Sequence, residues 1–260
     1  MPRLTDPALI RARLERDRPW AAYALTDLAP GFFEASEWHA GAEASLLLLY
    51  RAFETPVLVT VGTPRCIDPL LDEIRDERRL YLSVRPEIMP LISARYRVED
   101  QKPMWRMVLE PESFPLAAGG DAVRLGPADL PALEALYADG QSAGEAPDFF
   151  HASMLEQGVF FGVREGQALA AAAGTHSCAW AESVGTVGNV YTRRDRRGRR
   201  LAGQVTGAVA AELQRRGVRT IVLNVAQANP AAVRAYERLG FRRYCPFYEG
   251  LARAEPALLP

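Results

Sequence analysis

Apolar residues recur along the first half of the chain with two spacings, one typical of strands and one typical of helices. Mostly apolar runs, some rich in β-branched residues, predict strands at 45–51, 56–62, 79–84 and 104–109. The first two runs are separated only by residues 52–55 and are expected to form a hairpin. Helices are expected at 7–18, where the charges alternate, and at the mostly apolar 20–28. Two more are expected at 67–78, where apolar residues lie about one helical turn apart, and at 86–96.

The second half of the chain shows the same mixture of patterns. Strands are expected at 122–126, 159–164, 167–176, 182–192 and 220–225, and helices at 127–139, 148–157, 201–216 and 229–240. Asp148 is the expected cap of the second of these helices. Between the halves, residues 110–121 contain two prolines and adjacent glycines without periodicity, which predicts a linker. We therefore expect an α/β protein of two tandem domains, 1–112 and 121–252.

The two halves resemble each other in the order of their elements. A helix, a strand, a second helix and a second strand follow one another from 67 and again from 201. The offset places Val84 opposite Val225 and Tyr96 near Tyr236. We interpret this order as a degenerate internal repeat, with chance similarity as the alternative. Residues 62–65 offer no glycine–arginine loop, so the first half is not expected to bind a cofactor.

The composition of the chain argues against several classes of protein. The chain has 260 residues, is 48% hydrophobic and carries a formal net charge of −1, which gives no bulk attraction to nucleic acid or to an anionic membrane. No run approaches the roughly 20 apolar residues of a membrane span, and the charged N-terminal segment has no signal-peptide core. Cys66, Cys178 and Cys245 are too far apart to suggest a disulfide framework. We expect a cytoplasmic protein with no metal site.

An arginine-rich loop at 193–200 joins the end of a predicted strand to the start of a predicted helix. Unpaired N–H groups and the positive end of the helix dipole meet at such a helix start, which favours phosphate oxygens. Gly198 allows the backbone to approach a ligand closely. The six arginines of this loop are therefore interpreted as part of a site for a ligand with several phosphates. A solvated basic face and a nucleic-acid patch are the alternatives.

These residues resemble a known family. Residues 197–202 (RGRRLA) are similar to the acyl-CoA pyrophosphate loop of GCN5-related N-acetyltransferases, except that Arg200 stands in place of the inner glycine. The second motif, Asn229–x–x–Ala–x–x–x–Tyr–x–x–x–Gly–Phe, follows the strand 220–225 and is similar to the family's closing motif. The resemblance covers about residues 120–250 and is nearest to the FR47-like branch. It implies the GNAT fold, with a degenerate GNAT-like N-terminal half.

The resemblance also implies where acetyl-CoA binds. The strand 184–192 would splay from the strand 220–225, with a bulge at Gly188 and Asn189, and the pantetheine arm would bond to the backbone in the gap. Asn229 would contact that arm, although a helix N-cap beside Pro230 is a sufficient role for it. The implied cofactor-binding residues are Val190, Tyr191, Thr192, Arg197, Gly198, Arg199, Arg200, Leu201, Ala202, Gly203, Asn229, Ala232 and Tyr236.

Tyr236 is the implied catalytic residue, as the general acid that protonates the departing thiolate of CoA, with core packing as its alternative role. The residues do not identify a general base. Its candidates are Glu145, His151, His176 and Glu182, each of which is better explained as ordinary surface, and a water chain would also serve. Cys178 and Cys245 have no histidine nearby in sequence, which gives a covalent acyl-cysteine route little support.

We therefore predict an acetyl-CoA-dependent N-acetyltransferase that transfers acetyl directly to a small-molecule or peptide amine, with the acceptor and oligomeric state left open. A non-catalytic acyl-CoA-binding or sensing protein is the alternative, and a nucleic-acid-binding protein ranks below both. One CoA per chain is expected. The loop 141–147 would shape the acceptor site. The first half would contribute a wall of the acceptor cleft or a partner face, through residues that could equally be buried aromatics: Trp20, Tyr23, Trp38 and His39.

Overall fold

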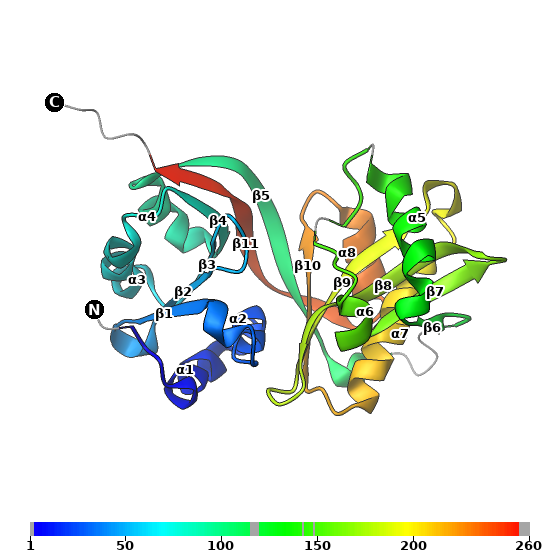
Figure 1. The fold of residues 1–260 in the computed structure, drawn as a ribbon, viewed down its shortest axis with the longest axis horizontal. Coiled ribbons are helices and arrows are strands. Elements are labelled where there is room, and N and C mark those ends of the chain that lie inside the picture. The colour runs from blue at the N-terminus through cyan, green and yellow to red at the C-terminus, as the bar shows by residue number, and fades with distance from the viewer. Residues whose placement is uncertain (1–2, 115–119, 142, 148, 255–260) are drawn as a thin grey trace. The chain divides into compact units, whose positions relative to one another are not determined.

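The computed structural model describes residues 3–114, 120–141, 143–147 and 149–254. Its described residues divide into two compact units, one within Met1–Arg106, Ala226–Ala228 and Tyr244–Pro260, the other within Met107–Val225 and Asn229–Arg243. Strands and helices alternate in each unit (Figure 1), which confirms the expected mixed α/β class. The compact units cross the boundaries expected from the sequence, since residues 244–254 belong to the first unit. Tandem domains at 1–112 and 121–252 remain a prediction.

The first unit is built on a mixed sheet whose strands are β1 (Ser36–Ala40), β2 (Leu46–Tyr50), β3 (Val57–Val61), β4 (Arg79–Val84), β5 (Tyr96–Leu109) and β11 (Phe241–Ala254). The last two strands also give residues to the second unit. β2 and β3 form the expected antiparallel hairpin, β4 runs parallel to β3, and β11 runs antiparallel to β4. The helices are α1 (Pro7–Leu14), α2 (Ala22–Thr26), α3 (Pro64–Leu71) and α4 (Met89–Ser93).

Two expectations for the first unit are wrong in detail. β1 was not predicted, because its sequence SEWHA is polar, yet it pairs antiparallel with β2 and buries Trp38 and His39. The helix expected at 86–96 ends at Ser93, and Tyr96 instead opens β5, where its hydroxyl donates to the Ile74 carbonyl at 3.1 Å. Tyr96 is therefore not equivalent to Tyr236, which lies in a helix. That pairing fails as support for the internal repeat, which itself remains a prediction.

The second unit follows the predicted order of elements closely. Its strands are β6 (Val123–Leu125), β7 (Phe160–Glu165), β8 (Ala168–Ala179), β9 (Val184–Thr192) and β10 (Thr220–Ala226). They are antiparallel from β6 to β9, and β10 is parallel to β9. The helices are α5 (Leu130–Gln141), α6 (Met154–Gln157), α7 (Leu201–Arg215) and α8 (Pro230–Glu237). α6 begins later than expected, and its predicted cap, Asp148, lies outside the described residues.

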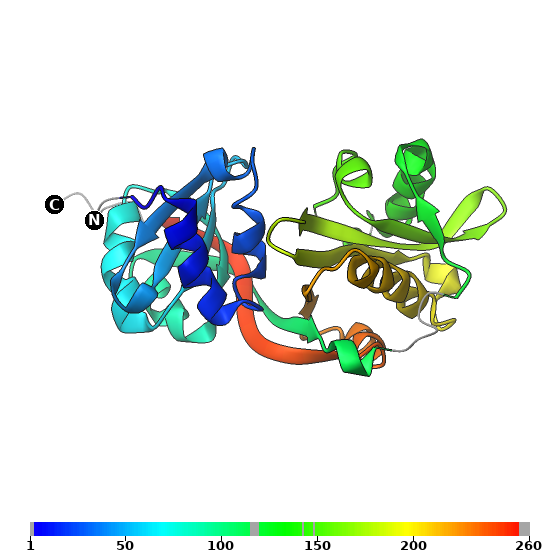
Figure 2. The ribbon, with the colours of Figure 1, turned by 90° about the horizontal axis from the view of Figure 1, so that it is seen from below.

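The helices of the second unit cover both faces of its strands. Figure 2 shows the green α5 and α6 on one side and the gold α7 on the other. An apolar core on the α5 side contains Leu133, Tyr137, Phe160 and Tyr191, all buried. Val205, Val209 and Leu213 of α7 are fully buried at the spacing that the sequence pattern predicted. Within the described ranges, no helix is long and apolar enough to cross a membrane.

Candidate functional site

The strand β9 contains a bulge at the position expected from Gly188 and Asn189. Ala172 pairs with Tyr191 and Gly174 pairs with Gly188, so two residues of β9 stand opposite one residue of β8. Asn189 has a φ of +51°, a left-handed conformation that asparagine tolerates better than most residues. The hydroxyl of Tyr137 on α5 donates to the Asn189 carbonyl at 2.8 Å in a buried hydrogen bond. A side chain of α5 therefore stabilises the bulge in β9.

Pairing between β9 and β10 ends where the bulge begins. Their last paired residues are Val187 and Leu223, and β9 continues to Thr192 without a partner on this side among the described strands. Each residue of a strand carries one N–H and one C=O, and unpaired groups at an open edge can bond to another extended chain. The stretch Val190–Thr192 therefore offers backbone hydrogen-bonding groups in a gap between two parallel strands.

The helix α7 begins next to this gap. Gly198 has a φ of +81°, and Arg200, the residue at the helix N-cap, has a φ of +62°. The N–H groups at 201–203 belong to the first helical turn, which has no intrahelical acceptors, and the first intrahelical bond into this segment runs from Gln204 N to the Arg200 carbonyl at 3.2 Å. A side chain at Gly198 or Gly203 would meet open space, so a ligand can approach both backbones. The loop thus has the features of an anion cradle.

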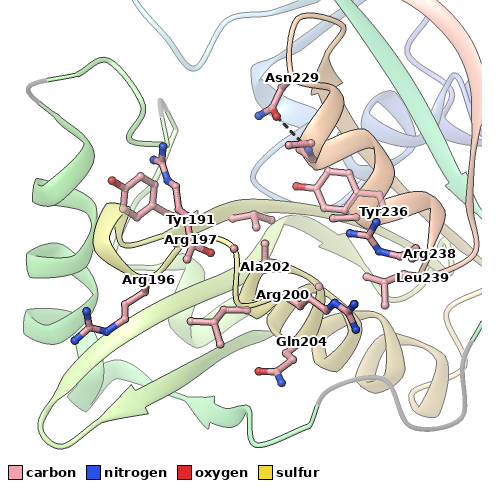
Figure 3. Close-up of a pocket in the computed structure, with 18 of the residues that line it drawn as sticks. Tyr191, Arg196, Arg197, Arg200, Ala202, Gln204, Asn229, Tyr236, Arg238 and Leu239 are labelled. Atoms are coloured by element: carbon pink, nitrogen blue, oxygen red, sulfur yellow. Dashed lines mark hydrogen bonds between the residues drawn. The ribbon is translucent and has the colours of Figure 1, made fainter.

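The helix α8 lines the same pocket as the start of α7. The Asn229 side chain caps α8 by accepting from Ala232 N at 3.0 Å, with Pro230 in the first helical position, as the sequence predicted (Figure 3). Tyr236 lies two turns further and is only 7% exposed, with its ring edge-on to Phe241 at a centroid distance of 6.2 Å. Burial raises the pKa of Tyr236 to about 12, so its hydroxyl stays protonated at neutral pH and can donate a proton.

These elements enclose one pocket of about 950 Å³ that lies within the second unit. Every candidate cofactor residue except Arg199 lines it, and Tyr236 is among them. The sequence reasoning missed other lining residues, of which Ala231, Ala235, Arg238 and Leu239 follow the helical spacing of Ala232 and Tyr236 and could have been found from it. Gly120, Gly144, Arg196 and Gln204 also line the pocket. The volume is in the range of small-molecule sites.

The arginines of the loop are largely neutralised by carboxylates, which the sequence analysis did not anticipate. Glu165, in the β7–β8 hairpin, pairs with three of them, and Asp195 lies within the loop itself. The pairs are Arg193 with Asp195 at 2.6 Å, Arg194 with Asp139 at 3.8 Å, Arg196 with Glu165 at 2.7 Å, Arg197 with Glu145 at 2.6 Å and Arg199 with Glu165 at 3.5 Å. Arg200 and Arg238 have no such pair among the described residues.

Of the four candidate bases, only Glu145 lines the pocket. The hydrogen bond from Arg197 lowers the pKa of Glu145, which keeps it ionised but makes it a weak base. His151 is exposed and Glu182 is buried away from the pocket lining. The ring of His176 packs against Gly188, where a Cβ would lie 2.5 Å from its Nε2. The general base therefore remains unassigned.

The remaining candidates lie elsewhere. Burial raises the pKa of Cys178 to about 11 and also raises that of Cys245, so neither thiol forms much thiolate near neutral pH. Trp20, Trp38 and His39 are buried in the first unit, which agrees with their alternative role as core residues, and Tyr23 is half-buried. Among the described residues, no group of three or more His, Cys, Asp or Glu side chains could hold a metal ion.

Comparison with known proteins agrees with this geometry. Residues 130–241 match the family described as Acetyltransferase (GNAT) family. No curated protein is similar enough in sequence to count as a match. Among solved structures, a GCN5-related N-acetyltransferase from Kribbella flavida is 17% identical, with a TM-score of 0.62 over 92% of this chain and 97% of that one. A GNAT-family protein from Novosphingobium aromaticivorans is 24% identical, with a TM-score of 0.56 over 81% and 89%.

A tandem GNAT protein from the clavulanic acid biosynthesis pathway is 17% identical, with a TM-score of 0.54 over 91% of this chain and 88% of that one. At these identities the likeness shows the fold, and the family match covers every pocket-lining residue except Gly120. The FR47-like branch and the degenerate N-terminal half remain predictions. The chain thus has the GNAT fold, and its residues 130–241 match the GNAT acetyltransferase family.

Proposed function

We propose that this protein is an acetyl-CoA-dependent N-acetyltransferase that transfers an acetyl group directly to a small-molecule or peptide amine. One observation carries the proposal: the stretch Val190–Thr192 beyond the end of β9–β10 pairing, the helix-start cradle of α7 and Tyr236 all border the same pocket. An elongated ligand with an amide-bearing arm and a pyrophosphate matches these features in order. The match of residues 130–241 to the acetyltransferase family supports the same reading.

The residues present fit acetyl-CoA, which would supply an acyl group activated as a thioester. N–H groups at 201–203 and the open backbone at Gly198 would hold its pyrophosphate. The unpaired backbone of Val190–Thr192 would bond to its pantetheine arm as a strand would. Both contacts use backbone groups fixed by the fold, which limits the entropy lost on binding.

Tyr236 would protonate the departing thiolate. Tyr236 borders the pocket, and its hydroxyl is protonated throughout the neutral range. The attacking amine must lose a proton, and Glu145, held by Arg197, is poorly suited to accept it. We infer that this proton leaves through water, which requires no dedicated base.

The cradle is tested by thermal denaturation with and without acetyl-CoA. A ligand that binds only the folded state raises the melting temperature by mass action. Gly198→Glu places a negative side chain in a cradle for anions, at a residue with φ of +81°, and should abolish the rise. An unchanged rise in this variant would refute the assignment of the loop.

Turnover separates an enzyme from a sensing protein. The assay mixes the protein with acetyl-CoA and pooled amines and follows release of free thiol. Thiol release that depends on both the protein and an amine supports the transferase. Binding of acetyl-CoA without turnover on any amine would favour an acyl-CoA-binding or sensing protein instead.

A further inference from the structure

Arg200 and Arg238 differ from the paired arginines of the loop. The loop's other arginines each have a carboxylate within 4.0 Å, whereas the guanidinium of neither Arg200 nor Arg238 makes an ion pair or hydrogen bond within the described part of the chain. Both are exposed, and both line the pocket of the second unit. Two positive charges on the pocket wall are therefore not balanced by described residues of the protein.

The backbone conformation at position 200 is one that arginine adopts only at a cost in free energy. With a φ of +62°, Arg200 adopts a conformation that glycine enters freely and that costs free energy for residues with a Cβ. Its side chain makes no capping hydrogen bond to α7. Backbone strain retained at a pocket points to a role in binding. Since no described residue pairs with the guanidinium, the partner that would offset the cost is an anion in the pocket.

Arg238 lies where it can act with Arg200. Arg238 is the C-cap of α8, Arg200 is the N-cap of α7, and the two helices pack against each other. In the view of Figure 3 their side chains lie at the same end of the pocket. The pocket-lining Gln204, one turn after Arg200, adds a carboxamide to this part of the wall. Two guanidiniums and an amide donor favour a doubly charged, oxygen-rich group, because guanidiniums bind phosphate oxygens in pairs of hydrogen bonds.

We propose that Arg200 and Arg238 bind the terminal phosphomonoester of the acyl donor, the 3′-phosphate of its nucleotide, and thereby make the protein selective for donors that carry it. This inference rests on the proposed function. The pyrophosphate of the donor is already matched by the backbone cradle at Gly198 and the first turn of α7. The phosphomonoester carries a charge near −2 on a single phosphate at neutral pH, whereas each phosphate of the pyrophosphate diester carries one negative charge, so the phosphomonoester is the group suited to two free arginines.

The test is calorimetric titration of the full chain with CoA and with 3′-dephospho-CoA. Arg200→Gln removes the charge and keeps a Cβ at the strained position, while Arg200→Lys keeps the charge. Arg238→Gln is paired with Arg234→Gln, an exposed arginine one turn earlier on α8 that does not line the pocket. The melting temperature of each variant without ligand confirms that it is folded.

We expect the wild type to bind CoA on the order of 100-fold more tightly than 3′-dephospho-CoA, since each charge-assisted contact at an exposed site is worth about tenfold. Arg200→Gln and Arg238→Gln should each reduce this ratio to about tenfold by weakening CoA binding alone. Arg200→Lys should retain most of it, and Arg234→Gln all of it. Equal affinities of the wild type for the two ligands, or variants that weaken both ligands equally, would overturn the proposal. Failure to bind either ligand would instead overturn the proposed function, and the inference with it.

Discussion

The hydrogen bond from Tyr137 to the Asn189 carbonyl gives a sharp test of the bulge in β9. Tyr137→Phe removes only the hydroxyl and leaves the buried carbonyl without its donor at 2.8 Å. Leaving a buried acceptor unsatisfied costs about 1–3 kcal/mol in free energy of unfolding. For a chain of this size we expect a fall of roughly 2–8 °C in melting temperature. Because the bulge positions Val190, Tyr191 and Thr192 at the pocket, CoA affinity should also fall, by about threefold to tenfold.

A matched control is available in the first unit. Tyr96 is also buried and donates from its hydroxyl to a backbone carbonyl, that of Ile74, at 3.1 Å. Tyr96→Phe should destabilise the protein by a similar amount and leave CoA affinity unchanged. Urea unfolding measures the first quantity and calorimetric titration the second. If Tyr137→Phe loses stability and keeps full CoA affinity, as the control does, the bulge does not position the ligand.

Three further predictions concern the hydroxyl of Tyr236, the titration of two tyrosines and the number of CoA sites. Tyr236→Phe should lower kcat by roughly 10²-fold with little change in CoA affinity. An unchanged kcat would show that Tyr236 only packs in the core. Burial raises the pKa of Tyr236 and Tyr244 to about 12, above the value of about 10 in an unfolded chain, so the stability that these two groups contribute should be fully present below about pH 10 and be lost as the pH rises from about 10 to 12. Melting temperature against pH measures this fall, and a flat profile over that range would contradict it. Calorimetry should give one CoA per chain, and two equivalent sites would show that the first half also binds.

The sequence predicted the framework of the pocket better than its electrostatics. β9, β10, α7 and α8 follow from periodicity, and the Asn229–Pro230 cap is a local motif, so each can be read from a short window. The carboxylates that pair with Arg196 and Arg197 come from residues 31 and 52 positions away. Such pairs depend on how β7 and the segment after α5 pack against the loop, which no local pattern encodes. The six arginines therefore suggested more free positive charge than the structure leaves.

The weakest predictions concern short or polar elements. β1 is stabilised by pairing with β2 rather than by its own propensity, and β5 extends back to Tyr96 through the charged stretch RVEDQK. In both cases tertiary pairing overrides local composition. The left-handed conformations of Asn189 and Arg200 were also not predicted from the sequence. For Arg200, the glycine that it replaces in the resembled motif could have indicated such a conformation.

The last strand has a consequence for synthesis of the chain. Residues 248–253 of β11 pair with 79–84 of β4, so the sheet of the first unit is completed by a segment made about 160 residues later. At roughly 5–20 residues per second, the edge of β4 would wait about 10–30 seconds for its partner on the ribosome. An open edge is prone to pair with other chains in that interval. Fragments that end before residue 244 should therefore aggregate, and holdase chaperones should bind nascent chains of intermediate length more than the finished protein.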